Sequence, residues 1–170
     1  MKKITLVLLA WFGIGMTMNA VAGEGSVFSG FSLDSAQSTE NGVKNSSFGF
    51  TGLASFRPNE YYGVELQGGY LGKSGPFTTN VEVDLSAVGL LPLGDSGFKL
   101  YGKAGVADVY SSLSAVTANN LGLTYGAGVE FQRNKGAIRL GFQHFNVGNN
   151  TLSPSLSTNL IGITFMSKTQ

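Results

Sequence analysis

Five charged residues are the first candidates for chemistry, because each lies at an alternate position of an otherwise apolar segment. They are Glu65, Lys99, Lys103, Glu130 and Arg139. Glycine, hydroxyl and amide side chains share their face. If that face lines a narrow interior, the charges must be paired, because a buried charge without a partner is strongly destabilising. We expect a salt-bridged plug in which Arg139 and Lys103 contact Glu130 and Glu65; a gated ion path is the alternative.

The single histidine is the second candidate, because an imidazole can act as a general base. His144 would need a hydroxyl nucleophile within hydrogen-bond reach. The residue two positions later is Asn146, so only Ser153 or Ser155, folding back from a later segment, could supply one. The other interpretation is an amphipathic side chain on the outward face near the membrane interface. We therefore expect no catalytic residue.

Other ligand-binding chemistry is not indicated. No Cys, His or acidic cluster has metal-ligand spacing, and Gly126-Ala127-Gly128 lacks the third glycine and the following helix of a dinucleotide loop. The chain has 11 Lys and Arg against 10 Asp and Glu, so no basic patch suggests a nucleic-acid partner. We expect no metal and no cofactor.

The first 22 residues have the pattern of a secretory signal peptide. Lys2 and Lys3 precede an apolar segment at 4–16, and Ala20-Val21-Ala22 resembles a cleavage site. The apolar part is too short to span a membrane. The expected domain is therefore 23–170, and, without any cysteine, no disulfide stabilises it.

The clearest structural pattern lies between residues 121 and 145. Apolar and small or polar residues alternate before and after Arg133-Asn134-Lys135-Gly136, which has turn chemistry. A period of two is a strand period, and each arm has about the ten residues that a tilted strand needs to cross a bilayer. This segment is predicted to be a β-hairpin with one apolar face.

The rest of the chain repeats this pattern. Strands are expected at 27–33, 46–57, 62–70, 81–87, 98–106, 121–132, 138–145 and 160–165. Long loops are expected at 34–45, 71–79, 110–119 and 147–156, alternating with short turns at 58–60, 92–97 and 133–136. Eight strands with alternating connections predict an all-β fold, an eight-stranded antiparallel transmembrane β-barrel with up-and-down meander topology. A lipocalin-type barrel would have the opposite pattern, an apolar interior and a polar exterior.

Three segments near the end of the chain resemble the OmpA-type family of outer-membrane barrels: LYGKAGV from Leu100, YGAGVEF from Tyr125 and IRLGFQHF from Ile138. The resemblance implies a bacterial outer-membrane protein without the family's peptidoglycan-binding domain. It departs from the family in that Phe165 is followed by five further residues. His144 also resembles, in part, the histidine of the lipid A deacylase barrels, but Asn146 replaces their serine.

These observations lead to an expected function. We expect a non-enzymatic, monomeric envelope protein of the outer membrane, whose long loops face outward and support envelope integrity or surface interactions. Its expected partners are outer-membrane lipid, lipopolysaccharide and the barrel-assembly machinery. A lipid A deacylase-like enzyme using His144 and a small gated pore are the alternatives.

Overall fold

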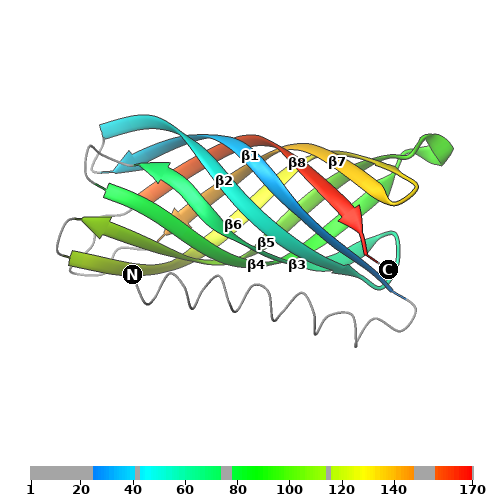
Figure 1. Cartoon of the computed structure of the whole chain (residues 1–170), viewed down its shortest axis with the longest axis horizontal. Helices are drawn as coiled ribbons and strands as arrows, with labels where there is room; N and C mark the ends of the chain where they lie inside the picture. The colour runs from blue at the N-terminus through cyan, green and yellow to red at the C-terminus, as the bar shows by residue number, and fades with distance from the viewer. Residues whose placement is uncertain (1–24, 41–42, 74–77, 114–115, 148–155, 170) are drawn as a thin grey trace.

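The computed structural model describes residues 25–40, 43–73, 78–113, 116–147 and 156–169, in which the chain forms a closed antiparallel barrel (Figure 1). Its elements are β1 (Ser26–Glu40), β2 (Val43–Arg57), β3 (Tyr62–Lys73), β4 (Thr78–Pro92), η1 (Gly94–Ser96), β5 (Phe98–Leu113), β6 (Val116–Arg133), β7 (Gly136–Val147) and β8 (Leu156–Lys168). Each strand pairs with the next, and β8 pairs with β1. The predicted eight-stranded meander is confirmed. The predicted signal peptide, 1–22, lies outside the described residues.

No helix among the described residues is long and apolar enough to cross a membrane.

Strand pairing also fixes the tilt of the barrel. A path of directly paired residues once around the sheet starts at position 98 of β5 and returns at position 108, ten residues further along. It runs through Phe98, Phe131, Ile138, Phe165, Phe31, Gly52, Gly68, Val83 and Asp108. With ordinary strand spacing, this shift tilts the strands by about 40° from the barrel axis, within the range of transmembrane barrels.

The outer wall carries an apolar band around the barrel. Every strand contributes large apolar side chains that are exposed at alternate positions, among them Phe31, Leu33, Phe50, Val64, Leu85, Leu100, Val106, Leu123, Val129, Leu140 and Ile163. Among the described residues, eight charged side chains from these strands are buried at inward-facing positions. This arrangement is the one expected of a barrel whose outer wall faces lipid and whose lumen is polar.

The predicted long loops are wrong over most of their length. Residues 34–40 and 43–45 belong to paired strands, as do 71–73, 78–79, 110–113 and 116–119. Only the segment 147–156 keeps a long connection, of which 148–155 lie outside the described residues. The physical reason is that, beyond the apolar band, outward positions also become polar. The in–out alternation continues there, but the apolar–polar alternation that reveals it in a sequence is lost.

The two ends of the barrel differ. Three short turns join β2 to β3, β4 to β5 and β6 to β7 at the end that we call the turn end, on the right in Figure 1, where the C-terminus also lies. Asn134, with φ of 52°, takes the left-handed conformation that the predicted 133–136 turn requires. At the opposite end, called the hairpin end, the strands project as long hairpins.

Candidate functional site

Eight charged side chains are buried in the lumen within the described part of the chain, and together they form the candidate site. The acids are Asp34, Glu65, Glu82, Asp84 and Glu130, and the bases are Arg57, Lys103 and Arg139. Strand alternation positions them, because each faces inward between two outward-facing neighbours. None is more than 7% exposed, so their mutual contacts decide what the lumen can do.

One ion pair bridges the lumen between β2 and β6. Arg57 donates from Nη1 to Glu130 Oε1 at 2.7 Å and from Nη2 to Oε2 at 2.8 Å. Four steps around the barrel separate these strands in either direction, so they lie on opposite walls. The guanidinium also lies 4.4 Å from the ring centroid of Phe28. Such a two-pronged contact with one stacked face is available to arginine and not to lysine.

A second bridge runs between β7 and β3, which also lie on opposite walls. Arg139 Nη1 donates to both oxygens of Glu65, at 2.9 and 3.2 Å. Its Nη2 and Nε donate to Glu130 Oε2 at 3.0 and 3.2 Å, which joins the two bridges into one network. Tyr101 covers the guanidinium, with its ring centroid 4.3 Å away.

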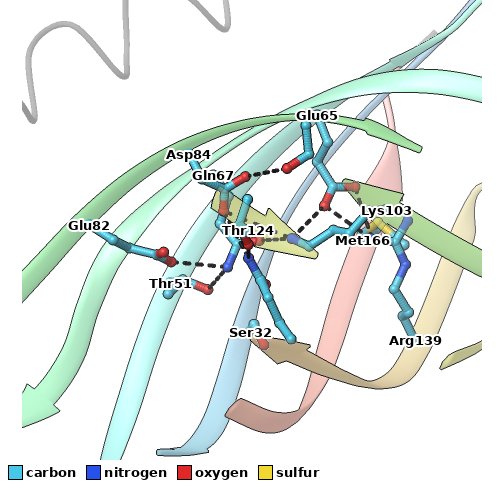
Figure 2. A network of polar contacts seen from close by, with 12 residues as sticks. Ser32, Thr51, Glu65, Gln67, Glu82, Asp84, Lys103, Thr124, Arg139 and Met166 are labelled. Carbon is cyan, nitrogen blue, oxygen red and sulfur yellow. Dashed lines mark hydrogen bonds and ion pairs between the residues drawn. The ribbon is translucent and has the colours of Figure 1, made fainter. Parts of the chain in front are cut away.

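Lys103 links this network to the half of the lumen nearer the hairpin end, which we call the hairpin half; the other half is the turn half (Figure 2). Its Nζ donates to Gln67 Oε1 at 2.7 Å and lies 3.5 Å from Glu65 Oε1 and 3.9 Å from Asp84 Oδ2. A cavity of about 20 Å³ beside Lys103 and Asp34 has the volume of about one water molecule.

In the hairpin half of the lumen, the hydrogen bonds to the acids come mainly from uncharged donors. Asp84 accepts from Ser86 at 2.8 Å and from Gln143 at 3.0 Å. Glu82 Oε1 accepts from Gln67 at 3.2 Å. Asp34 accepts from Ser32 at 2.8 Å.

Apolar side chains fill the lumen on both sides of the polar groups. The hairpin-end cluster consists of Ala36, Leu71, Ala107, Val109, Phe145, Val147 and Leu160. Two smaller clusters lie toward the turn end, one of Phe28, Leu53, Ala137 and Met166 and one of Val88, Leu90 and Tyr101. The charged network is therefore enclosed between apolar layers.

The structure brings together four of the five predicted network residues: Glu65, Lys103, Glu130 and Arg139. Lys99 was wrongly included, because it makes no ion pair in the described part of the chain. It faces the lumen near the turn end and is half-buried there, while Arg57 and Arg139 occupy the carboxylate of its cross-strand neighbour Glu130. Arg57 was missed, although its inward position follows from that of Ser55 two residues earlier.

His144 faces outward on β7. Its Nδ1 lies 2.7 Å from Asn159 Oδ1 on β8, and its ring packs against Tyr125 and Phe142. Within the described residues its side-chain hydrogen-bond partner is therefore an amide and not a hydroxyl. Ser153 and Ser155, the two serines considered as nucleophiles, lie outside the described residues.

Comparison with protein families decides what kind of barrel this is. The model of the outer membrane protein beta-barrel domain matches residues 5–167. The chain belongs to this family. Its members are bacterial outer-membrane proteins, so the expected localisation and the resemblance to OmpA-type barrels are confirmed. A comparison with curated proteins found no match.

Solved structures share the fold at low sequence identity. Neisserial surface protein A is similar with a TM-score of 0.70 at 14% identity, over 86% of this chain and 99% of that chain. Ail of Yersinia pestis, solved with the heparin analogue sucrose octasulfate, gives 0.55 at 16% identity, over 84% and 97%. The N-terminal barrel domain of Pseudomonas aeruginosa OprF gives 0.52 at 12%, over 81% and 96%. These likenesses show the common barrel architecture.

Proposed function

We propose that this family member is a closed, non-enzymatic barrel that serves as an envelope scaffold and presents its hairpin end to the cell exterior. The observation that carries this proposal is the pair of bridges across opposite walls, Arg57 to Glu130 and Arg139 to Glu65. An eight-stranded barrel has a lumen only wide enough for side chains to fill. Two ion pairs along its diameters support a lumen that is closed to ions at that level.

The energetics support a plug over a gate. Separating a buried ion pair leaves an uncompensated charge and costs about 3–5 kcal/mol. An opening would have to separate both cross-lumen pairs, Arg57–Glu130 and Arg139–Glu65, and it would also have to part the apolar hairpin-end cluster. Both barriers oppose spontaneous conduction.

The contacts of His144 support a non-enzymatic role. A Ser–His mechanism needs the imidazole beside a hydroxyl, whereas His144 is engaged with Asn159 across the β7–β8 pair. On the outer wall, beside Tyr125 and Phe142, an imidazole suits the boundary between the apolar band and the headgroup layer.

The hairpin end is proposed to be the outer end, because transmembrane barrels have short periplasmic turns and longer extracellular segments. Polar outward residues of the projecting strands, such as Ser35, Gln37 and Asn159, would lie among lipopolysaccharide headgroups. The barrel is expected to be a monomer inserted by the barrel-assembly machinery. Functional contacts of a rigid scaffold usually lie on such projecting segments.

Two measurements test this proposal. Liposomes containing the purified barrel should take up small solutes no faster than protein-free liposomes. Mass spectrometry should find identical lipid A in cells with and without the protein. Loss of an acyl chain that depends on the protein, and that disappears in His144→Ala, would replace the scaffold with the enzyme. Rapid solute uptake would replace it with the pore.

A further inference from the structure

The two halves of the lumen differ in charge balance. The turn half is balanced, with two bases and two acids: Arg57, Arg139, Glu65 and Glu130. The hairpin half has three acids and one base: Asp34, Glu82, Asp84 and Lys103. If every group carried its ordinary charge, two negative charges would remain without a counterion in a lumen enclosed by apolar residues.

Glu82 is a fully buried acid with little compensation. It is 0% exposed, and no cation lies within ion-pair distance of it in the described part of the chain. Its Oε1 accepts one hydrogen bond, from Gln67, while its Oε2 has no hydrogen-bond partner among the described residues. A buried carboxylate is normally satisfied by several donors or by a cation.

Part of the surroundings of Glu82 is apolar. It lies directly across the β4–β5 pair from Val109, which belongs to the apolar hairpin-end cluster. The charged groups that face it are Asp84 on its own strand, Asp34 on β1 and Lys103 on β5, two acids against one base. The neighbouring strands β3 and β2 present Gln67 and Thr51, which are uncharged (Figure 2).

Of the other two acids, Asp84 is clearly better placed to stay ionised. Asp84 accepts two hydrogen bonds, from Ser86 and Gln143, and Lys103 lies 3.9 Å away. Asp34 accepts from Ser32, and its Oδ2, like Glu82 Oε2, has no hydrogen-bond partner among the described residues, but Asp34 is 7% exposed and lines the small cavity that Lys103 also lines. A difference in environment between neighbouring carboxyls drives their protonation states apart.

We propose that the hairpin half of the lumen is a proton-binding site and that Glu82 holds the proton at neutral pH. The proton removes one of the two excess negative charges and leaves Asp84, at 3.9 Å, and Asp34, on the same small cavity, beside Lys103. It comes from solvent during folding and is released on unfolding, when the glutamate becomes hydrated and ionises. A metal ion fits less well, because no group of His, Cys or acidic side chains in the described part of the chain is arranged to hold one.

This site has a consequence for pH dependence that is independent of whether the lumen conducts. Over the pH range in which a hydrated glutamate is ionised but Glu82 is not, the folded barrel binds one proton more than the unfolded chain. Its stability therefore falls as the pH rises through that range. Glu82→Gln, which mimics the neutral carboxyl, should remove this part of the slope.

Infrared difference spectroscopy of the barrel in phospholipid vesicles tests the proposal directly. At neutral pH the wild type should show the carbonyl band of a protonated carboxylic acid, which lies at higher frequency than the bands of a carboxylate. Glu82→Gln should lose this band. The matched control is Glu65→Gln, which makes the same chemical change at a buried glutamate that already has Arg139 and Lys103, and it should keep the band.

Two results would overturn the proposal: a wild-type spectrum without a protonated carboxyl at neutral pH, or a band that persists in Glu82→Gln. A band that disappears instead in Asp84→Asn would move the proton to Asp84 and refute the assignment to Glu82. If the Glu65 variant does not fold, the comparison of the wild-type and Glu82→Gln spectra still shows whether Glu82 carries the proton. As a second measurement, the carbonyl band of the wild type is followed as the pH is raised. Its loss should be accompanied by a lower urea midpoint.

Discussion

Arg139→Ala is the sharpest perturbation of the luminal network, because one side chain serves two carboxylates. It removes four hydrogen bonds, two to Glu65 and two to Glu130, and uncovers the ring of Tyr101. The alanine side chain cannot refill the space. We expect a folded but clearly destabilised barrel.

The magnitude follows from what remains after the substitution. Glu130 keeps both hydrogen bonds from Arg57, at 2.7 and 2.8 Å, so it stays paired. Glu65 keeps only Lys103, at 3.5 Å, and becomes an undercompensated buried charge. Breaking a buried pair costs about 3–5 kcal/mol, and because both acids retain a cation we expect the lower end, about 3 kcal/mol.

The assay is reversible urea unfolding in phospholipid vesicles, followed by β-type circular dichroism and by the mobility difference between boiled and unboiled samples on gels. Arg133→Ala is the matched control, since Arg133 is exposed beside the β6–β7 turn, and it should leave the urea midpoint unchanged. A double-mutant cycle that combines Arg139→Ala with Glu65→Gln measures the coupling free energy between Arg139 and Glu65. Equal midpoints for Arg139→Ala and Arg133→Ala would show that the network does not stabilise the barrel.

Two further substitutions, Gly141→Ala and Arg57→Lys, test other parts of the lumen, and Gly89→Ala on the outer wall is the control for the first. Gly141→Ala would bring a methyl group against the hydroxyl of Tyr101, and we expect a loss of about 1–3 kcal/mol from overpacking. Gly89→Ala, whose methyl would have only Gly102 O within 4.0 Å, should be tolerated in the same urea assay; similar losses for both would contradict this packing. Arg57→Lys keeps the charge but loses the two-pronged contact with Glu130, so the urea midpoint should fall by an amount equivalent to about 1–3 kcal/mol, and an unchanged midpoint would argue against a role for the guanidinium geometry.

The fold was predictable where the bilayer imposes a pattern on the sequence. Between the interfaces, lipid demands apolar outward residues, so strands such as β7 are visible from alternation alone. Beyond the apolar band this demand ends. The extension of β1 through Gln37 and Thr39 therefore has no sequence signal, although its pairing with β2 continues without interruption.

The sequence predicts which face of each strand carries the site residues. It does not predict how deep in the lumen they lie or which partners they contact. Alternation places Lys99 and Lys103 on the same face, yet only Lys103 lies deep enough to meet Glu65. Arg57 directly precedes Pro58. A charged residue beside a proline is typical of a turn, so this feature alone does not reveal that Arg57 lies in the lumen. Its pairing with Glu130 depends on which walls face each other and on a ten-residue shift around the sheet, and neither quantity is local in the sequence.

Single-channel recording in planar bilayers tests the central claim, that the lumen is closed by two bridges along its diameters. The wild-type barrel should give no conductance steps, whereas a variant carrying both Arg57→Ala and Arg139→Ala, in which the apolar hairpin-end cluster remains as a barrier, should give brief and infrequent steps, with Arg133→Ala as the silent control. The wild-type trace decides even if the double variant does not insert. Regular open steps from the wild type, of the same size as those of the double variant, would contradict the claim and establish a pore.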